Sequence, residues 1–182
     1  DYFIARSIAL LKPGGLAAFL TSSGTMDKAD ATARTHIAKS ANLVAAIRLP
    51  EGSFRRDAGT DTVVDILFFR KRKIAEAQDD VSWLEIDEIR PATDDEGAIR
   101  VNRWFADNPD MVLGTHALTS GPFGETYTCR PRVGEDLAAS LNAAVGLLPE
   151  NVYDGEPTEI DLDLEEELAE IVDLRPGNAN VR

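Results

Sequence analysis

The first third of the chain alternates between helical and strand-like patterns of apolar positions. In residues 2–11 the apolar side chains recur at helical spacing, which predicts a helix. They are Phe3, Ile4, Ile8 and Leu11. Pro13 and the pair Gly14-Gly15 end this pattern, because proline disfavours helical backbone in the preceding residue and paired glycines permit a tight reversal. Residues 15–21 are continuously apolar, which is typical of a strand buried on both faces of a parallel or mixed sheet.

Three more regular segments complete the first 73 residues. A helix is expected over roughly residues 27–40, where Asp27 or Asp30 can cap the free amides of the first turn. Strands are expected at residues 43–49 and 62–69, which are rich in branched and aromatic side chains. A loop by composition separates these two strands. The predicted order is therefore helix, strand, helix, strand, loop, strand.

The rest of the chain predicts a mixed α+β extension over residues 74–149 and an acidic helix or tail over residues 150–182. The last helix of the extension should bury the apolar face formed by Leu137, Leu141, Val145 and Leu148. The expected elements of the extension are a half-exposed strand at residues 81–86, short elements at residues 99–105 and 127–131, and the helix at residues 134–148.

Charge divides the chain at the same boundary. Residues 1–73 carry twelve Lys and Arg against seven Asp and Glu, a net charge of +5, whereas residues 74–182 carry seven against twenty-five, a net charge of −18. The total of −13 does not exclude a nucleic-acid partner, because phosphate attraction is local and is screened by salt. The basic part can face DNA, and the acidic part is not a general DNA-binding surface. Residues 150–173 hold eleven acids and no Lys or Arg, so a linker leading into a further domain is the alternative to an acidic helix.

Three segments of the basic part carry a resemblance to a known family. They read LKPGGLAAFLTSSG, NLVAAIRLPEGSF and GTDTVVDILFFRKR, in that order. Together they resemble the N-6 adenine DNA methylases, in particular the type found in large plasmid and phage proteins that join a methylase to a helicase. Residues 102–114, NRWFADNPDMVLG, are similar to the segment that follows the methylase core in those proteins.

The resemblance implies the closing half of a Rossmann-like class I methyltransferase sheet, in which the last two strands form a hairpin-like pair and the final strand runs antiparallel to the rest. It also implies S-adenosylmethionine as the cofactor of the parent protein and the exocyclic amine of adenine in DNA as the methyl acceptor. The family's glycine-containing cofactor loop and its Asn-Pro-Pro-Tyr or Asn-Pro-Pro-Phe motif do not occur in this chain. We therefore assign no catalytic and no cofactor-binding residue, and we expect the fragment alone to be inactive and not to bind the cofactor.

Phe54, Arg55 and Arg56 are the candidate substrate-binding residues. In similar methylases an aromatic side chain between the last two strands packs on the extruded adenine, and Phe54 occupies the matching position. Arg55 and Arg56 follow it and are suited to contact backbone phosphates. The alternatives are that Phe54 only packs at the edge of the sheet and that the two arginines are ordinary solvated charges.

Other motifs have simpler interpretations. Asn108-Pro109 lacks the second proline and the aromatic residue of the methylase motif, so it indicates a turn. Gly14-Gly15 also indicates a turn, because anion-binding glycine loops follow a strand and open a helix. Trp104 and Phe105 are expected to anchor the extension onto the core, with base stacking by Trp104 as the alternative. One cysteine, Cys129, and two separated histidines favour neither a disulfide framework nor a zinc site.

A non-enzymatic role is the competing interpretation. In it, a methyltransferase-like half-sheet docks onto the rest of the same polypeptide, for example a helicase region. The chain begins at aspartate within a helical pattern, so we expect a piece of a longer protein whose first strand presents an unpaired edge that permits a homodimer. No apolar run approaches the length of a membrane span, so we expect a cytoplasmic protein with no membrane partner.

Overall fold

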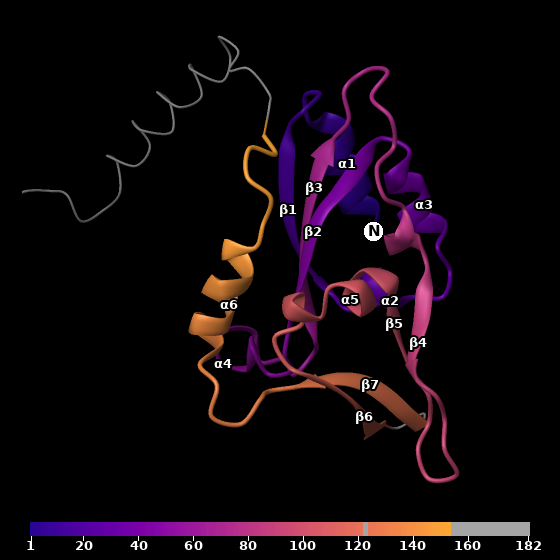
Figure 1. Ribbon diagram of the computed structural model, residues 1–182, viewed down its shortest axis with the longest axis vertical. Coiled ribbons are helices and arrows are strands. Elements are labelled where there is room, and N and C mark those ends of the chain that lie inside the picture. Colours follow the sequence, from indigo (N-terminus) through magenta and orange to yellow (C-terminus); the bar gives the residue numbers. More distant parts are fainter. Residues whose placement is uncertain (122–123, 154–182) are drawn as a thin grey trace, which may run out of the picture.

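The computed structural model describes residues 1–121 and 124–153 and has a mixed α/β fold (Figure 1). Its central sheet has three strands in the order β1-β3-β2. Two antiparallel hairpins lie beside it, β4-β5 and β6-β7. The strands are β1 (Leu16–Ser22), β2 (Ala41–Leu49), β3 (Val64–Lys71), β4 (Ile86–Arg90), β5 (Ile99–Asn102), β6 (Thr115–Gly121) and β7 (Gly124–Arg130).

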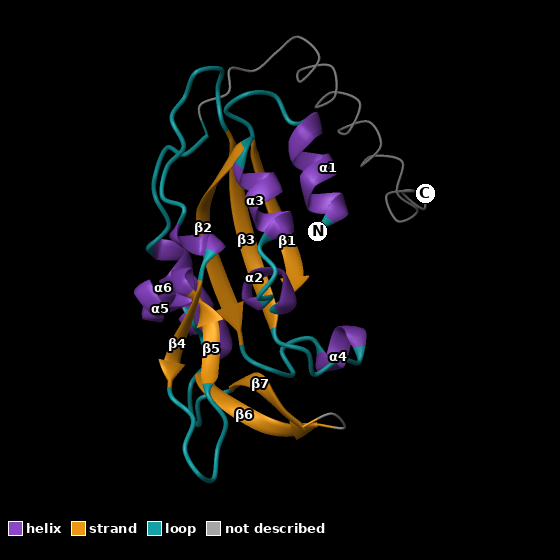
Figure 2. Ribbon diagram, turned by 90° about the vertical axis from the view of Figure 1, so that its right-hand side faces the viewer, coloured by secondary structure: helices purple, strands orange, loops and turns teal. Residues whose placement is uncertain are grey.

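Helices pack on both sides of the central sheet. In Figure 1, α1 and α3 lie on one side of it and α6 lies on the other, and Figure 2 shows the side that carries α1 and α3 facing the viewer. None of the helices in the described ranges is long and apolar enough to cross a membrane. The helices are α1 (Tyr2–Leu10), α2 (Gly24–Asp27), α3 (Thr32–Ala38), α4 (Arg55–Ala58), α5 (Arg103–Asp107) and α6 (Leu137–Gly146), with 3-10 turns η1 (Ser82–Leu84) and η2 (Pro109–Met111).

The strand pairs of the central sheet are antiparallel, which corrects the expected parallel or mixed arrangement but agrees with the expected antiparallel direction of the last strand. β3 is antiparallel to both of its neighbours, with Leu16 opposite Arg70 in β1 and Leu49 opposite Val64 in β2. β1 is also not buried on both faces. Its residues alternate between exposed and half-buried, and Leu20 is 60% exposed, because among the described residues no element covers the face of β1 that carries Leu20. Among the described residues, continuous apolarity therefore marks a strand at the edge of the sheet and not a central one.

Two other expected elements take a different form. The helix expected at residues 27–40 is broken into α2 and α3, and the Asp30 carboxylate accepts the backbone N–H of Thr32 at 2.9 Å at the start of α3. The strand expected at residues 81–86 is the 3-10 turn η1, which buries Trp83, and β4 begins only at Ile86. The Asp80 carboxylate accepts the N–H and O–H of Ser82, and this local bonding favours a turn over an extended strand.

The two faces of β3 carry two hydrophobic clusters. Leu67 and Phe69 pack with Ile4 and Ile8 of α1, while Ile66 and Phe68 point the opposite way. The first cluster also contains Trp83, Val101 and Phe105 from beyond residue 73, so the basic part and the extension share one core. Phe3, expected in the buried face of α1, is instead 80% exposed.

The second cluster lies under α6. Ala144 is buried there, and Leu137, Leu141 and Leu148 pack against the same cluster as Ile47 and Leu49 of β2. Val145, expected in this apolar face, is 47% exposed.

The extension follows the outer edge of β2. The indole N–H of Trp104 donates to the carbonyl of Ala46 at 3.1 Å, and the backbone N–H of Leu113 donates to the carbonyl of Arg48 at 2.9 Å. Phe105 is buried at 1% exposure, so the expected anchoring by this pair of aromatic residues is confirmed. Asn108-Pro109 begins η2 and Gly14-Gly15 forms a tight reversal, as expected of turns.

Candidate functional site

The candidate site lies where β1 and β2 end and β3 begins. Ser22 and Leu49 both pair with Val64, so the carboxyl ends of β1 and β2 meet the amino end of β3 at one edge of the sheet. A cavity of about 310 Å³ opens there. Apolar side chains and hydroxyls line it: Leu20, Thr21, Ser22, Phe54, Ala58, Thr60, Thr62 and Val64.

Phe54 stands at the start of α4 in a compact turn. The Ser53 hydroxyl donates to the Pro50 carbonyl at 2.6 Å, and the backbone N–H of Arg55 donates to the carbonyl of Gly52 at 3.0 Å. Gly52 has a φ of 76°, which favours glycine and lets the chain reverse within this turn. The Phe54 side chain is half-buried and packs against the cluster under α6, while it also contributes to the cavity wall. It is therefore held in place and still reachable from the cavity.

Arg55 and Arg56 lie in the exposed first turn of α4. Arg55 forms an ion pair with Asp61 on the other side of the same loop, with side-chain exposures of 69% and 61%. The hydrogen bond to the Asp61 carboxylate raises the pKa of Arg55. The structure therefore brings the three sequence-predicted residues together on one loop. Phe54 faces the cavity, and neither arginine is among the residues that line it.

A buried ionic cluster lies close to the same edge of the sheet. Arg48 forms two hydrogen bonds of 2.8 Å to the Asp65 carboxylate and an ion pair of 2.8 Å with Asp27. Burial by itself lowers the pKa of Arg48, but the Asp65 and Asp27 carboxylates more than offset this and raise it well above its usual value. The guanidinium also stacks over Phe105 at 4.1 Å and Tyr127 at 5.1 Å from the ring centroids.

Asn102 joins this ionic cluster to the extension. Its backbone N–H donates to Asp27 at 2.9 Å, and its side-chain amide donates to the carbonyls of Met26 and Trp83. Asn102 and Arg48 are both fully buried. The cluster therefore fixes the extension against the sheet, and its charged groups are committed to one another.

Two further titratable groups, Cys129 and His116, lie near the cluster. Burial raises the pKa of the Cys129 thiol to about 12, so the thiolate that would act as nucleophile is scarce at neutral pH. Burial and the charge of Arg48 lower the pKa of His116, whose Nδ1 lies 2.9 Å from the Tyr127 hydroxyl. Both residues lie on the β6-β7 hairpin, where Cys129 belongs to the first hydrophobic cluster and His116 contacts Tyr127.

The sequence argument missed the Arg48 cluster. The available signal was a pair of opposite charges, Arg48 and Asp65, each inside an apolar strand, and the two residues lie opposite each other in the sheet. Nothing in the spacing pointed to Asp27 as a further partner.

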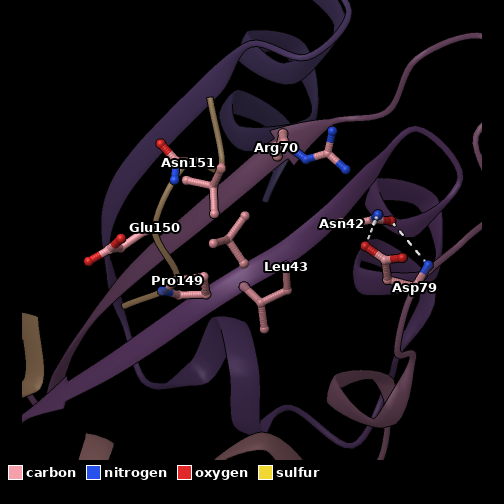
Figure 3. Close-up of a pocket in the computed structure, with 9 residues that line it drawn as sticks. Asn42, Leu43, Arg70, Asp79, Pro149, Glu150 and Asn151 are labelled. Carbon is pink, nitrogen blue, oxygen red and sulfur yellow. Dashed lines mark hydrogen bonds between the residues drawn. The ribbon is translucent and has the colours of Figure 1, made fainter. Parts of the chain in front are cut away.

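A second hollow, of about 430 Å³, lies between the sheet and residues 149–152 (Figure 3). Figure 3 shows Pro149, Glu150 and Asn151 on one side of it, and Asn42 and Asp79 on the other. The Asn42 amide donates to Asp79 at 2.5 Å, and Arg70 forms an ion pair with Glu76. The two pairs, Asn42 with Asp79 and Arg70 with Glu76, do not converge on a common point. The hollow is therefore a weaker candidate for a ligand site than the Phe54 cavity.

Comparisons of this chain with protein-family models, with curated proteins and with solved structures find no match.

Proposed function

We propose that this chain supplies the base-binding edge of a DNA methyltransferase that transfers a methyl group from S-adenosylmethionine to the exocyclic amine of adenine. The observation that carries the proposal is the position of Phe54. It stands in a short, hydrogen-bonded turn between two neighbouring strands and forms part of the wall of an apolar cavity at the carboxyl edge of the sheet. An aromatic side chain so placed can stack on a base taken out of the duplex.

The strand arrangement supports the same proposal. β2 and β3 follow each other in the chain, pair directly, and are joined by the loop that carries Phe54. β3 also runs antiparallel to β1. This is the geometry implied for the last strands of the methyltransferase sheet by the resemblance of residues 1–73 to the adenine methylases.

The chain's own residues account for base binding and not for methyl transfer. An exocyclic adenine nitrogen is a poor nucleophile, so the reaction needs polar groups that orient it in line with the methyl donor. The cavity offers a ring and four hydroxyls but no charged side chain that would hold the methionine end of the cofactor. S-adenosylmethionine therefore does not fit the residues present here, and the groups that bind it and orient the amine belong to other parts of the methyltransferase.

Three substitutions of Phe54 test this function in the whole polypeptide that contains the chain. We expect Phe54→Leu, which keeps an apolar side chain of similar size, to lower kcat/KM for DNA methylation by about tenfold, because base stacking on an aromatic ring contributes roughly 1–3 kcal/mol. Phe54→Tyr should retain most of the activity, and Phe54→Ala should lose the most. Methyl incorporation from labelled cofactor gives the rate, and fluorescence anisotropy gives DNA affinity, which should change less.

Equal rates for wild type and Phe54→Leu would remove Phe54 from the base site. A whole polypeptide without an Asn-Pro-Pro-aromatic motif and without methyl transfer would overturn the enzymatic proposal and favour a docking module within a larger methylase-helicase protein.

A further inference from the structure

The loop that carries Phe54 is tied to the extension as well as to the sheet. The backbone N–H of Glu51 donates to the carbonyl of Cys129 at 2.7 Å, and the Thr128 hydroxyl donates to the Glu51 carboxylate at 2.5 Å. Both main chain and side chain of Glu51 are thus bonded to consecutive residues of β7. Glu51 is half-buried and Thr128 is 3% exposed, so water competes poorly for these bonds.

The connection from Glu51 to Phe54 is short and ordered. Only Gly52 and Ser53 separate them, and both the N–H and the hydroxyl of Ser53 donate to the Pro50 carbonyl. Because this turn is held by its own hydrogen bonds, a shift of Glu51 also shifts the Phe54 ring three residues later.

The β6-β7 hairpin is itself fixed from several directions. Tyr127 lies against the buried guanidinium of Arg48, and Cys129 is fully buried in the main core. Near the start of β7, the Glu125 carboxylate accepts the backbone N–H of Gly97 at 2.7 Å. The hairpin is thus a firm support that the Phe54 loop contacts, and Figure 1 shows it next to the end of the sheet.

We propose that Glu51 and Thr128 are positioning residues, through which the acidic extension sets the place of the base-binding Phe54. This inference rests on the proposed function only for the role of Phe54. The acidic extension thereby contributes to the reaction by placing Phe54, although its negative charge makes it unsuited to bind DNA itself. The ordering of the loop by β7 is a property of the chain that can be measured without any assay of methylation.

Limited trypsin digestion of the 182-residue chain tests the ordering directly. Arg55 and Arg56 are exposed cleavage sites next to Phe54, and their cleavage rate reports opening of the loop. We expect Thr128→Val to raise cleavage after these two residues by about tenfold, because it removes the hydrogen bond that ties the half-buried Glu51 carboxylate to β7. Thr128→Ser restores the hydroxyl and should return the rate to the wild-type value.

Thr126→Val is the matched control, since Thr126 lies two residues earlier on the same face of β7 and is exposed. Its cleavage pattern should equal that of the wild type. Acceleration at Arg100 in parallel with Arg55 and Arg56 would show a general loss of stability and overturn the proposal. If Thr128→Val does not fold, Glu51→Gln, which keeps an acceptor but loses its charge, should raise cleavage at Arg55 and Arg56 by a smaller factor, and an unchanged rate would overturn the proposal.

The role in catalysis is tested in the whole polypeptide. Thr128→Val should lower kcat for methylation with little change in the KM for DNA, and Thr128→Ser should restore kcat, because Thr128 acts through the loop and touches no DNA. A loosened loop with unchanged kcat would overturn the positioning role. Absence of methylation in the wild type would count against the proposed function alone, with the digestion result still standing.

Discussion

At the scale of single residues, Arg48 connects more of the molecule than any other charged side chain whose contacts are described above. Its guanidinium is bonded to Asp65 of β3 and Asp27 of α2, and it stacks on aromatic rings of α5 and β7. A buried charge is stable only when it is paired and hydrogen-bonded. The strand position of Arg48 is therefore compatible with the fold only because elements far apart in sequence supply those partners.

Arg48→Met should destabilise the chain by about 3–5 kcal/mol, because it leaves the buried Asp65 carboxylate without its partner. Urea unfolding followed by circular dichroism measures the change. Arg55→Met is the control, since its ion pair with Asp61 is open to solvent, and it should leave the unfolding midpoint within error of the wild type. Equal effects of the two substitutions would contradict the structural role of Arg48.

At the scale of elements, β1 differs from its neighbours. It pairs with β3 on one edge only among the described residues, and Leu16, Ala18 and Leu20 on one face are exposed. An exposed apolar edge strand is a template for pairing with another chain. In contrast, the extension runs along the outer edge of β2 and bonds to it. The two edges of the sheet therefore differ in how far their backbone groups are already paired.

We therefore expect the isolated chain to form a homodimer through β1. Leu20→Lys places a charge on the strand and should shift the dimer to monomer in sedimentation velocity at equal concentration. Val133→Lys, at a residue that is fully exposed outside the sheet, should leave the dimer intact. A wild-type chain that stays monomeric at high concentration would be inconsistent with a β1 interface.

At the scale of the whole molecule, the basic part and the acidic extension share one hydrophobic core. Trp83, Val101 and Phe105 pack in the same cluster as Ile8, Leu67 and Phe69. The division of charge near residue 73 is therefore a division of surface and not of core. Opposite net charges on two packed parts also let one part face a polyanion while the other faces away from it.

A shared core predicts one cooperative unfolding transition. Both tryptophans, Trp83 and Trp104, lie in the extension, so tryptophan fluorescence reports its unfolding, whereas circular dichroism reports all helices and strands. We expect the two signals to give the same urea midpoint, because neither part keeps a complete core alone. Separate midpoints would mean that the parts unfold independently.

Local sequence patterns were sufficient to predict those elements whose conformation depends mainly on residues a few positions away in the chain. Apolar spacing and turn residues act over a few positions, and they predicted the first helix, most of the last helix and the turns at Gly14 and Asn108. They also predicted strands at residues 43–49 and 62–69, which the structure places at residues 41–49 and 64–71. The position of Phe54 between two strands was also predicted in this way. Residues 154–182, which carry most of the acidic segment, lie outside the described residues.

Tertiary structure alone decided which faces of the strands are covered and how the distant charges meet. The apolar run at residues 15–21 reads the same in an edge strand as in a central strand, because local composition does not record whether another element covers its face. Asp27 of α2 meets Arg48, and Thr128 of β7 meets Glu51, at sequence separations that no spacing rule connects. Burial makes these contacts strong, and burial is a property of the assembled chain.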